Sequence, residues 1–505
     1  MATVFGLDFG TTNSLASIVA DGRAVALTDL EDRPYPSVVL FRGEERIVGR
    51  AAKDQLDVAG VGVIGDAVRS PKASLGSGRA IHVAGVARSA REIVALIIQH
   101  VRDSSASYTH ELGMDEPLLE AVMTIPIDMD GRARRELRAA AADAGVLIRQ
   151  FVHEPLAALY GYLRGADDWQ RSVALLEGKL VLVFDWGGGT LDLTLCRVLG
   201  RTIIQIHNLG EGRIGGDVFD ERLRHLVQDE HARRHGLESL ERMPGAEAKL
   251  LNRCEQAKIS LSSSDDATVF VPAYLDVDGE AADVEVTITC DQLEELSADI
   301  VADGMGAIDR LLALSGLEDS DIEMVLATGG MVEMPVIRRR LKERFGPVRV
   351  PTVTDGQQII SKGAAWIGYD EQPLRLAKPL EVMLASDHPF SMAWAEMRLP
   401  VRGEVEVRAC DVFCVDPRDG FARFQFVRPS RPDRDKVSDE RSPYLTLLLP
   451  VDAEAAPLVE RLAVQASFDE DLVVTVEASS SLSNEKVSAE IHDLEFGLSL
   501  EGHTS

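Results

Sequence analysis

Two short segments of the chain combine an aspartate, glycines and threonines in the same order. Residues 4–10 (VFGLDFG) are an apolar run that ends in Asp8 and Gly10, and residues 180–189 (LVLVFDWGGG) end in Asp185 and three glycines. Each segment is followed by threonine and then by a second apolar run. Glycine turns let backbone N–H groups approach a phosphate closely. The aspartates imply a divalent cation, because Mg²⁺ is bound by one or two carboxylates together with substrate phosphates.

A single strand, aspartate and glycine turn is most often an ordinary hairpin. A further glycine pair, Gly329 and Gly330, follows the apolar run at residues 324–328. Two matching turns and this third strand end predict two related lobes that face each other across a phosphate and Mg²⁺ site.

The elements that position these turns have an α/β pattern. Strand and helix patterns alternate up to about residue 370, and the remainder has short strand patterns with turn residues. The segment DGRARRELRAAAADA at 130–144 predicts a helix with Asp130 as its N-cap. The segment VIRRRLKERF after Pro335 predicts another helix.

Composition and charge exclude several classes of protein. The 505 residues include 53 basic and 82 acidic side chains, for a net charge of −29. This charge disfavours nucleic acid, and the short basic runs at 231–235 and 338–340 are read as solvated helix faces. Neither a membrane-spanning apolar stretch nor a secretory signal pattern is found. Five scattered cysteines argue against a disulfide framework or a zinc site. We therefore expect a cytoplasmic protein without nucleic-acid or membrane partners.

The motifs together resemble the actin, sugar-kinase and heat-shock chaperone superfamily, and within it the heat shock protein 70 family (DnaK-like molecular chaperones). The resemblance is collinear from residue 4 to about 368. It rests on GLDFGTTNS, FDWGGGTLD, IPIDMDGRARRELRAAAADAG with HEPLAALYGY, LGEGRIGGDVFDERL, EQAKISLSS and LATGGMVEMP. It implies an actin-like two-lobed ATPase domain of duplicated ribonuclease H-like folds at 1–370. An interdomain linker at 371–388 and a small all-β, peptide-binding-like domain at 389–505 would follow.

The resemblance also implies a role for individual residues toward ATP or ADP and Mg²⁺. Asp8 and Asp185 would hold the metal through its waters. The catalytic residues would be Lys72 beside the γ-phosphate, Glu154 and Asp192 around the attacking water, and Thr190. The nucleotide-binding residues would be Gly10, Thr11, Thr12, Asn13, Gly187, Gly188, Gly189, Gly215, Gly216, Asp217, Glu255, Lys258, Ser262, Gly329 and Gly330.

From the residues alone, simpler interpretations stand beside these roles. Lys72 lies in a poorly patterned loop, where an exposed lysine is common. Glu154 precedes Pro155, and this pattern also fits an ordinary acidic residue at the N-terminus of a helix. Glu255 and Lys258 have the i, i+3 spacing of a surface ion pair.

The resemblance extends to elements that couple two domains. Pro126 and Arg134 match the family's proline switch and its partner arginine. Glu381-Val-Met-Leu-Ala385 resembles the interdomain linker, and the segment from Pro389 resembles the start of the peptide-binding domain. An aliphatic run is unusual for a flexible linker, so we expect it to dock on the first domain.

Three departures from the family pattern are visible. Met331 and Glu333 stand where the family has a serine or glutamine and an arginine that stacks on adenine, which predicts weaker adenine binding. No helical lid follows the closing strands near residue 496, so peptides should exchange faster. The polar, proline-containing segment 427–443 is expected to contain no persistent strand.

The leading hypothesis is an ATP-dependent chaperone, a slow ATPase that couples hydrolysis to binding and release of a client polypeptide. A J-domain cochaperone and a nucleotide-exchange factor would be its partners. The alternative is a degenerate nucleotide-binding scaffold that engages one dedicated protein without a productive ATPase cycle. A small-molecule kinase and an actin-like filament are further alternatives with less support.

Overall fold

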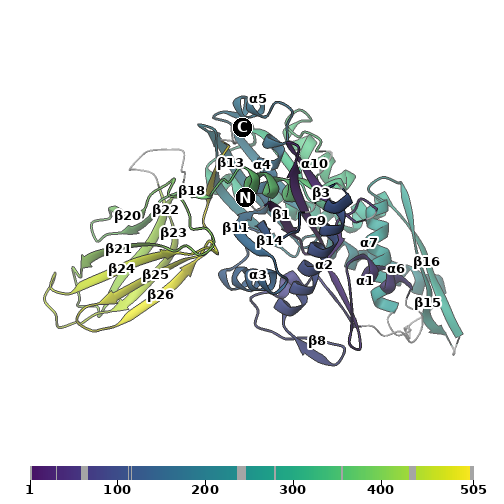
Figure 1. Ribbon diagram of the computed structural model, residues 1–505, viewed down its shortest axis with the longest axis horizontal. Coiled ribbons are helices and arrows are strands. Elements are labelled where there is room, and N and C mark those ends of the chain that lie inside the picture. The colour runs from purple at the N-terminus through teal and green to yellow at the C-terminus, as the bar shows by residue number, and fades with distance from the viewer. Residues whose placement is uncertain are drawn as a thin grey trace.

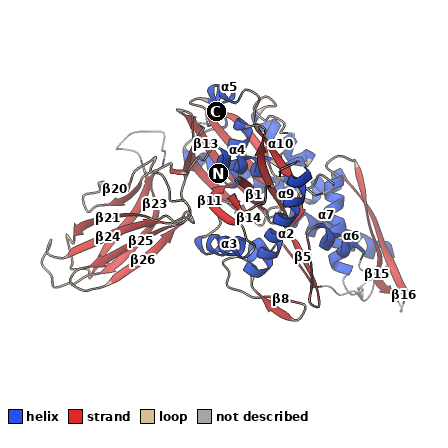
Figure 2. Cartoon of the chain, in the orientation of Figure 1, coloured by secondary structure: helices blue, strands red, loops and turns tan. Residues whose placement is uncertain are grey.

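The computed structural model describes residues 3–500 except 30, 59–65, 112, 115, 236–245, 278–279, 354–355 and 431–439. Figure 1 shows a large α/β domain and, to its left, an arm that contains strands β20 to β26. In the described residues, the helices all lie in the large domain, as Figure 2 shows. None of these helices is long and apolar enough to cross a membrane.

The first lobe of the large domain is built on a mixed sheet in the order β11-β10-β1-β2-β3. Strand β1 pairs in parallel with β10 and antiparallel with β2. The sheet strands are β1 (Val4–Phe9), β2 (Asn13–Ala20), β3 (Arg23–Leu27), β4 (Tyr35–Pro36), β10 (Glu120–Ile125) and β11 (Leu147–His153). The other elements are β5 (Val38–Arg42), β6 (Glu45–Val48), α1 (Arg50–Val58), β7 (Asp66–Arg69), η1 (Pro71–Ser74), β8 (Ile81–Val83), β9 (Val86–Arg88), α2 (Ala90–Glu111), α3 (Gly131–Asp143) and α4 (Glu154–Arg164).

The second lobe repeats this arrangement in a sheet ordered β17-β12-β13-β14-β27-β18. Strand β12 is antiparallel to β13 and parallel to β17, as β1 is to β2 and β10. The sheet strands are β12 (Leu180–Trp186), β13 (Thr190–Leu199), β14 (Thr202–Gly212), β17 (Ile322–Thr328), β18 (Arg375–Leu376) and β27 (Phe496–Ser499). The other elements are α5 (Trp169–Leu176), α6 (Gly216–His235), α7 (Ala246–Ser260), β15 (Asp266–Val277), β16 (Glu280–Thr289), α8 (Cys290–Leu296), α9 (Ala298–Ser315), η2 (Asp319–Asp321), η3 (Gly330–Glu333) and α10 (Pro335–Phe345). Helix α11 (Ile359–Tyr369) returns to the first lobe and packs on β1, β2 and α4. The repeat confirms the predicted duplicated, actin-like fold.

Local sequence signals explain these elements. Every residue of β12 is buried, as expected for a strand covered on both faces. The predicted helix at 130–144 is α3, and Asp130 caps it by accepting a hydrogen bond from the Ala133 N–H at 2.8 Å. The helix predicted after Pro335 is α10, with the proline in its first turn.

The arm is a sandwich of two sheets, ordered β20-β19-β22-β23 and β21-β24-β25-β26. Burial alternates along β24, so one side of the strand faces the interior of the sandwich. The strands are β19 (Leu380–Met383), β20 (Pro389–Ala393), β21 (Glu406–Phe413), β22 (Phe421–Pro429), β23 (Arg441–Pro450), β24 (Arg461–Phe468), β25 (Val474–Ser480) and β26 (Lys486–Ile491).

The segment predicted as a linker, 371–388, has a different structure. Part of it forms β18 in the sheet of the second lobe, and part forms β19 inside the arm. Leu380 and Val382 are buried, and Glu381 pairs with Arg441 at 2.6 Å. Pairing within a sheet buries the aliphatic side chains and satisfies the backbone, so the run is a core strand and not an exposed connection.

The segment 427–443 also differs from the prediction. Strand β22 continues to Pro429 and β23 begins at Arg441, with Val427 opposite Pro443 in the ladder. Residues 431–439 lie outside the described residues. Two of the segment's three prolines lie in the described residues, and both are tolerated: Pro429 ends β22, and Pro443 stands opposite Val427 at the register shift.

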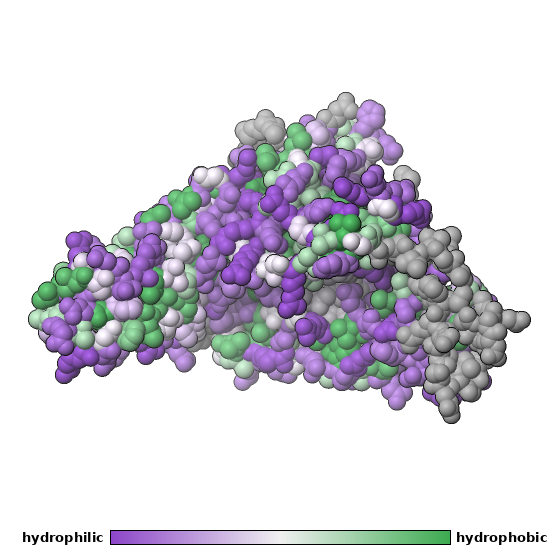
Figure 3. Space-filling model, turned by 90° about the horizontal axis from the view of Figure 1, so that it is seen from below, coloured by the Kyte–Doolittle hydropathy of each residue, from purple (hydrophilic) through white to green (hydrophobic). Residues whose placement is uncertain are grey.

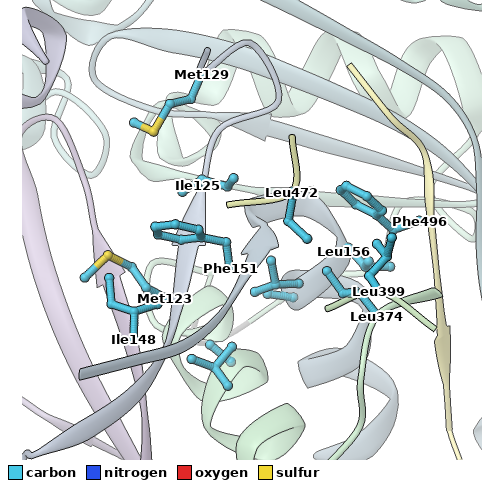
Figure 4. Packing of buried hydrophobic residues seen from close by; sticks show 14 of the residues in the cluster. Met123, Ile125, Met129, Ile148, Phe151, Leu156, Leu374, Leu399, Leu472 and Phe496 are labelled. Atoms are coloured by element: carbon cyan, nitrogen blue, oxygen red, sulfur yellow. The ribbon is translucent and has the colours of Figure 1, made fainter. Parts of the chain in front are cut away.

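A continuous apolar core joins the first lobe to the arm. Figure 4 shows Ile125 and Phe151, from β10 and β11, close to Leu472 of the arm. In the same view, Phe496 and Leu374 lie near Leu156 of α4. The arm therefore packs directly on the elements that carry the site described next.

Candidate active site

The two glycine turns face each other between the lobes. Gly10 to Asn13 connect β1 to β2, and Gly187 to Gly189 connect β12 to β13. A Cβ atom at position 188 would collide with Thr12 Oγ1, so the turns approach too closely for any residue except glycine there. A Cβ atom at Gly189 would lie 3.4 Å from Thr11 Oγ1. The structure brings both predicted turns together.

The first turn carries an unsatisfied hydroxyl. Thr12 Oγ1 is buried and has no hydrogen-bond partner among the described residues. Buried hydroxyls nearly always have a partner, because leaving one unpaired costs free energy. The orphaned oxygen therefore fits a ligand with polar oxygens between the turns.

Four acidic side chains lie at the base of these turns. Asp8 ends β1 and accepts a hydrogen bond from Thr124 Oγ1 at 2.7 Å. Asp192 accepts from Thr190 Oγ1 at 3.0 Å and from the Ile127 N–H at 3.2 Å. Asp185 is the penultimate residue of β12, and Glu154 is the first residue of α4. The predicted metal and catalytic carboxylates therefore share one site.

Burial and mutual repulsion disfavour the charged forms of these carboxylates. Burial, and next the charge of Glu154, raise the pKa of Asp8 to about 6 and that of Asp192 to about 8. The same causes raise the pKa of Asp185 well above its usual range. Carboxylates crowded in this way are stabilised by a cation between them. Their donor set and the glycine turns fit Mg²⁺ with a polyphosphate.

Lys72 lies within this acidic group. Its Nζ pairs with Glu154 Oε1 at 2.8 Å, and both side chains are buried. The lysine is held in the short turn η1, behind Ser70 in the left-handed conformation at φ 53°. Burial acts to lower the pKa of Lys72, but the charges of Glu154 and Asp8 outweigh it and raise the pKa. Lys72 is thus a buried cation, which contradicts the interpretation as an exposed loop lysine.

The other predicted glycines support the second turn. The Asp217 N–H donates to Gly188 O at 2.7 Å, and the Gly216 N–H donates to Gly187 O at 3.2 Å. Gly215 lies against the backbone of Gly188. The start of α6 therefore braces the turn.

Gly329 follows β17 with φ 87°, and a Cβ atom there would collide with the Trp186 carbonyl. This conformation and this contact require glycine. Gly330 begins η3, the short turn that carries Met331 and Glu333. The third glycine pair thus brings the predicted base-binding segment to the end of β12.

Ion pairs connect the lobes across the cleft. Glu255 of α7 accepts from Lys53 of α1 at 2.7 Å and from Arg69 of β7 at 3.1 Å. Burial acts to raise the pKa of Glu255, but these cations outweigh it and lower the pKa. A cavity of about 210 Å³ opens beside them, lined by Thr12, Ser37, Val38, Lys53, Arg69, Ser70, Asp217, Asp220, Glu221, Leu251 and Glu255. No local pattern indicates a role for Lys53 or Arg69, because their partner lies 202 and 186 residues away.

The charged side chains at the predicted base-binding end are paired with other residues of the chain. Lys258 pairs with Asp220 at 2.8 Å and donates to Gly216 O at 3.0 Å. Glu333 pairs with Arg338 of α10 at 2.5 Å. Met331 and Ser262 lie at the same end of the cleft. Met331 is buried with its sulfur near Gly216, and Ser262 lies half-buried just past α7.

Arg134 connects the large domain to the arm. It is fully buried and donates to the carbonyl oxygens of Asp471, Leu472 and His492 at 3.4, 3.0 and 2.9 Å. The residue predicted to relay a signal between domains is therefore in contact with the second domain. Pro126 directly follows the neighbouring strand β10, and its carbonyl accepts from the Met129 N–H at 3.4 Å.

Comparison with known proteins agrees with this geometry. A family model described as Hsp70 protein matches residues 4–76 and 72–383. The chain is also similar to the chaperone protein DnaK of Mycoplasmopsis agalactiae (strain NCTC 10123 / CIP 59.7 / PG2). The two are 26% identical over 514 aligned residues, which cover 97% of this chain and 82% of the relative. The matched residues include both glycine turns, Lys72 and Glu154.

Proposed function

The chain belongs to the Hsp70 family of chaperone ATPases, and from this premise we propose that it is an ATP-dependent molecular chaperone. In this proposal, hydrolysis of ATP to ADP and phosphate alters the affinity of the arm for a client polypeptide. The observation that carries it is the buried Lys72–Glu154 pair beneath two facing glycine turns.

Each residue of the site has a chemical task in hydrolysis. Phosphoryl transfer depends mainly on positioning and on stabilising charge. The Lys72 ammonium is placed to stabilise negative charge on the γ-phosphoryl oxygens, and the turn N–H groups with Thr11 and Thr12 cradle the phosphates. Mg²⁺, which Asp8 and Asp185 would hold, supplies neutralisation of phosphate charge. Glu154 orients the attacking water by accepting a hydrogen bond from it.

Asp192 is suited to act as the base. Burial and the charge of Glu154 raise its pKa to about 8, which makes the ionised carboxylate a stronger base than that of an ordinary aspartate. Thr190 donates to one of its oxygens and so fixes the orientation of the carboxylate. These two residues and Glu154 would therefore control the attacking water.

The free end of the arm supports client binding. Large apolar side chains are exposed there, at Phe413, Val415, Phe421, Leu458 and Leu482. Backbone hydrogen bonds join these loops, since the Leu458 N–H donates to Cys414 O and the Ser481 N–H to Arg461 O. Figure 3 shows apolar residues gathered on this arm. Exposed apolar clusters commonly mark sites for polypeptide ligands.

A J-domain cochaperone and a nucleotide-exchange factor are the partners we propose, with the cytoplasm as the compartment. All five cysteines are free thiols, which supports a reducing environment.

Single-turnover hydrolysis of Mg·ATP tests the proposal. The wild-type protein should release phosphate slowly, and Lys72→Ala should bind ATP without releasing phosphate. Equal release by both proteins would contradict the assigned site.

The Glu333–Arg338 pair favours a second candidate function, because it occupies the position where a base-stacking cation is expected. In that case the chain is a nucleotide-holding scaffold for one dedicated partner. Retention of intact ATP in the presence of a J-domain protein and an apolar peptide would support this candidate over the chaperone.

A further inference from the structure

The C-terminal strand β27 belongs to the sheet of the second lobe, although it follows the arm in sequence. It pairs with β14 through Thr202–Ser499, Ile203–Leu498 and Ile204–Gly497. Strand β18, through which the chain leaves the large domain, pairs along its other edge. Phe496, Leu498 and Leu500 are fully buried. The arm is therefore joined to the large domain at both of its ends.

Buried charges strengthen this junction. Glu495, next to β27, pairs with Lys378 at 3.0 Å and with Arg428 at 3.1 Å. The side chains of Glu495 and Lys378 are 2% and 0% exposed. Separating them would leave a buried charge without its partner, which strongly opposes detachment of the strand.

A second junction joins helix α3 to the arm. Arg134 donates to three carbonyl oxygens of the arm, as described above. Arg138 pairs with Asp471 at 2.6 Å. Release of the arm would require both junctions to break together, so a cycle that depends on its separation is disfavoured.

Strand β27 also reaches a neighbour of the catalytic carboxylate. Gln205 Oε1 accepts from the Phe496 N–H at 2.8 Å, and Gln205 Nε2 lies 3.4 Å from His153 Nδ1. The rings of His153 and Phe496 are 4.8 Å apart. His153 is fully buried and directly precedes Glu154. Figure 4 shows Phe496 pointing into the core beside Leu156 of α4, the helix that Glu154 begins.

We propose that β27 is the coupling element between the arm and the active site, and that the arm stays attached while it signals. A shift of the sandwich moves β27, and Phe496, Gln205 and His153 transmit the shift to Glu154. These three are positioning residues, since they act through Glu154 and do not touch the nucleotide. The inference rests on the proposed role of Glu154 in ATP hydrolysis.

A disulfide across the junction tests permanent attachment. Thr202→Cys with Ser499→Cys places the two thiols on directly opposed residues, at a separation that suits a disulfide. The oxidised protein should keep ATP turnover within about twofold of its reduced form, and should still respond to an apolar peptide. Each single-cysteine variant serves as the control for oxidation itself. Loss of the peptide response on oxidation, with recovery on reduction, would overturn the proposal.

Steady-state kinetics test whether Gln205 helps to position Glu154. Gln205→Ala should lower kcat at least fivefold and leave KM for ATP unchanged, because the turns and Lys72 remain intact. Gln150→Ala is the matched control, since Gln150 is also buried and donates one hydrogen bond, at 2.9 Å to Gln372 O. Equal kcat values for the two variants would contradict the chain through Gln205.

A measured distance between the arm and the large domain tests the inference independently of the proposed function. Spin labels at the exposed positions Gln170 and Ala453 report the distance between the large domain and the arm. Cys290 and Cys410 are replaced by serine in this protein. The distribution of this distance in the otherwise wild-type protein should stay the same with ATP, ADP or no nucleotide. Deletion of residues 496–505 should broaden the distribution. Deletion of 501–505 is the control. A nucleotide-dependent change to the broad distribution would overturn attachment, whereas failure to hydrolyse ATP would count only against the proposed function.

Discussion

The two ends of the nucleotide cleft differ in how their polar groups are satisfied. At the phosphate end, Thr12 Oγ1 has no partner among the described residues, and Asp8 and Asp192 have raised pKa values. At the base end, Lys258 pairs with Asp220 and Glu333 pairs with Arg338. The Thr12 hydroxyl at the phosphate end thus lacks a partner, whereas the charged side chains at the base end form ion pairs within the chain.

This difference indicates which contacts supply binding energy. A buried group that lacks a partner gains one when a ligand arrives, whereas a paired group must first give up an interaction. We therefore expect the phosphates and Mg²⁺ to dominate nucleotide affinity and the base to contribute little. Substitutions at the two ends should then have effects of very different size.

Lys72→Ala should have the largest effect. Removal of a preorganised buried cation from beside the γ-phosphate should lower kcat by roughly 10²- to 10³-fold. Steady-state phosphate release measures the change. Lys179→Ala is the control, because Lys179 also pairs with a glutamate but is half exposed on the surface. A loss of less than threefold in the Lys72 variant would argue against its place in the site.

Gly188→Ala should be next in size. The new Cβ would collide with Thr12 Oγ1 and force the turns apart, at a cost of about 2 kcal/mol. That cost corresponds to roughly 30-fold weaker binding of Mg·ATP, measured by fluorescence with a labelled nucleotide. Gly187→Ala is the matched variant in the same turn, because the nearest atom to its Cβ is Thr190 O at 3.8 Å. If both variants bind alike, the close approach of the turns is not important.

Lys53→Met should have a moderate effect. It removes one of the two cations that hold Glu255 across the cleft, while Arg69 remains. Loss of a partly buried pair between two lobes mainly speeds dissociation, so nucleotide release should be about fivefold faster. Stopped-flow chase of a labelled ADP gives the rate. An unchanged rate would show that the lobes separate without breaking this pair.

Glu333→Ala should have the smallest effect. The Glu333 and Arg338 side chains are 44% and 37% exposed, and an exposed pair of this kind contributes less than about 1 kcal/mol. The dissociation constant for ATP should change by less than about fivefold. A large loss of affinity, seen in competition binding, would mean that the base end matters as much as the phosphate end.

The phosphate end could be predicted from the sequence because its signals are local. Asp8 and Gly10 lie two residues apart, and Asp185 and Gly187 have the same spacing. Such spacing fixes the turn and the direction of the carboxylate without knowledge of distant contacts. The repeated strand pattern around these turns similarly predicted the duplicated lobes.

The junctions between distant segments could not be predicted in this way. The C-terminal strand at 496–499 pairs with residues almost three hundred positions earlier. The run Glu381-Val-Met-Leu-Ala385 resembled a docking linker, and nothing near it in the sequence indicates its partners Val427 and Arg441. Short strands carry little information about their partners. Pairing specificity there depends on tertiary packing, which one sequence does not reveal.

Isothermal titration of the full chain with Mg·ATP and Mg·GTP, each repeated without Mg²⁺, tests most directly whether the phosphate end governs nucleotide binding. We predict that both nucleotides bind with Mg²⁺, with dissociation constants within about tenfold of each other, and that removal of Mg²⁺ weakens both. Tight binding of ATP that excludes GTP, or binding that does not depend on Mg²⁺, would contradict this assignment.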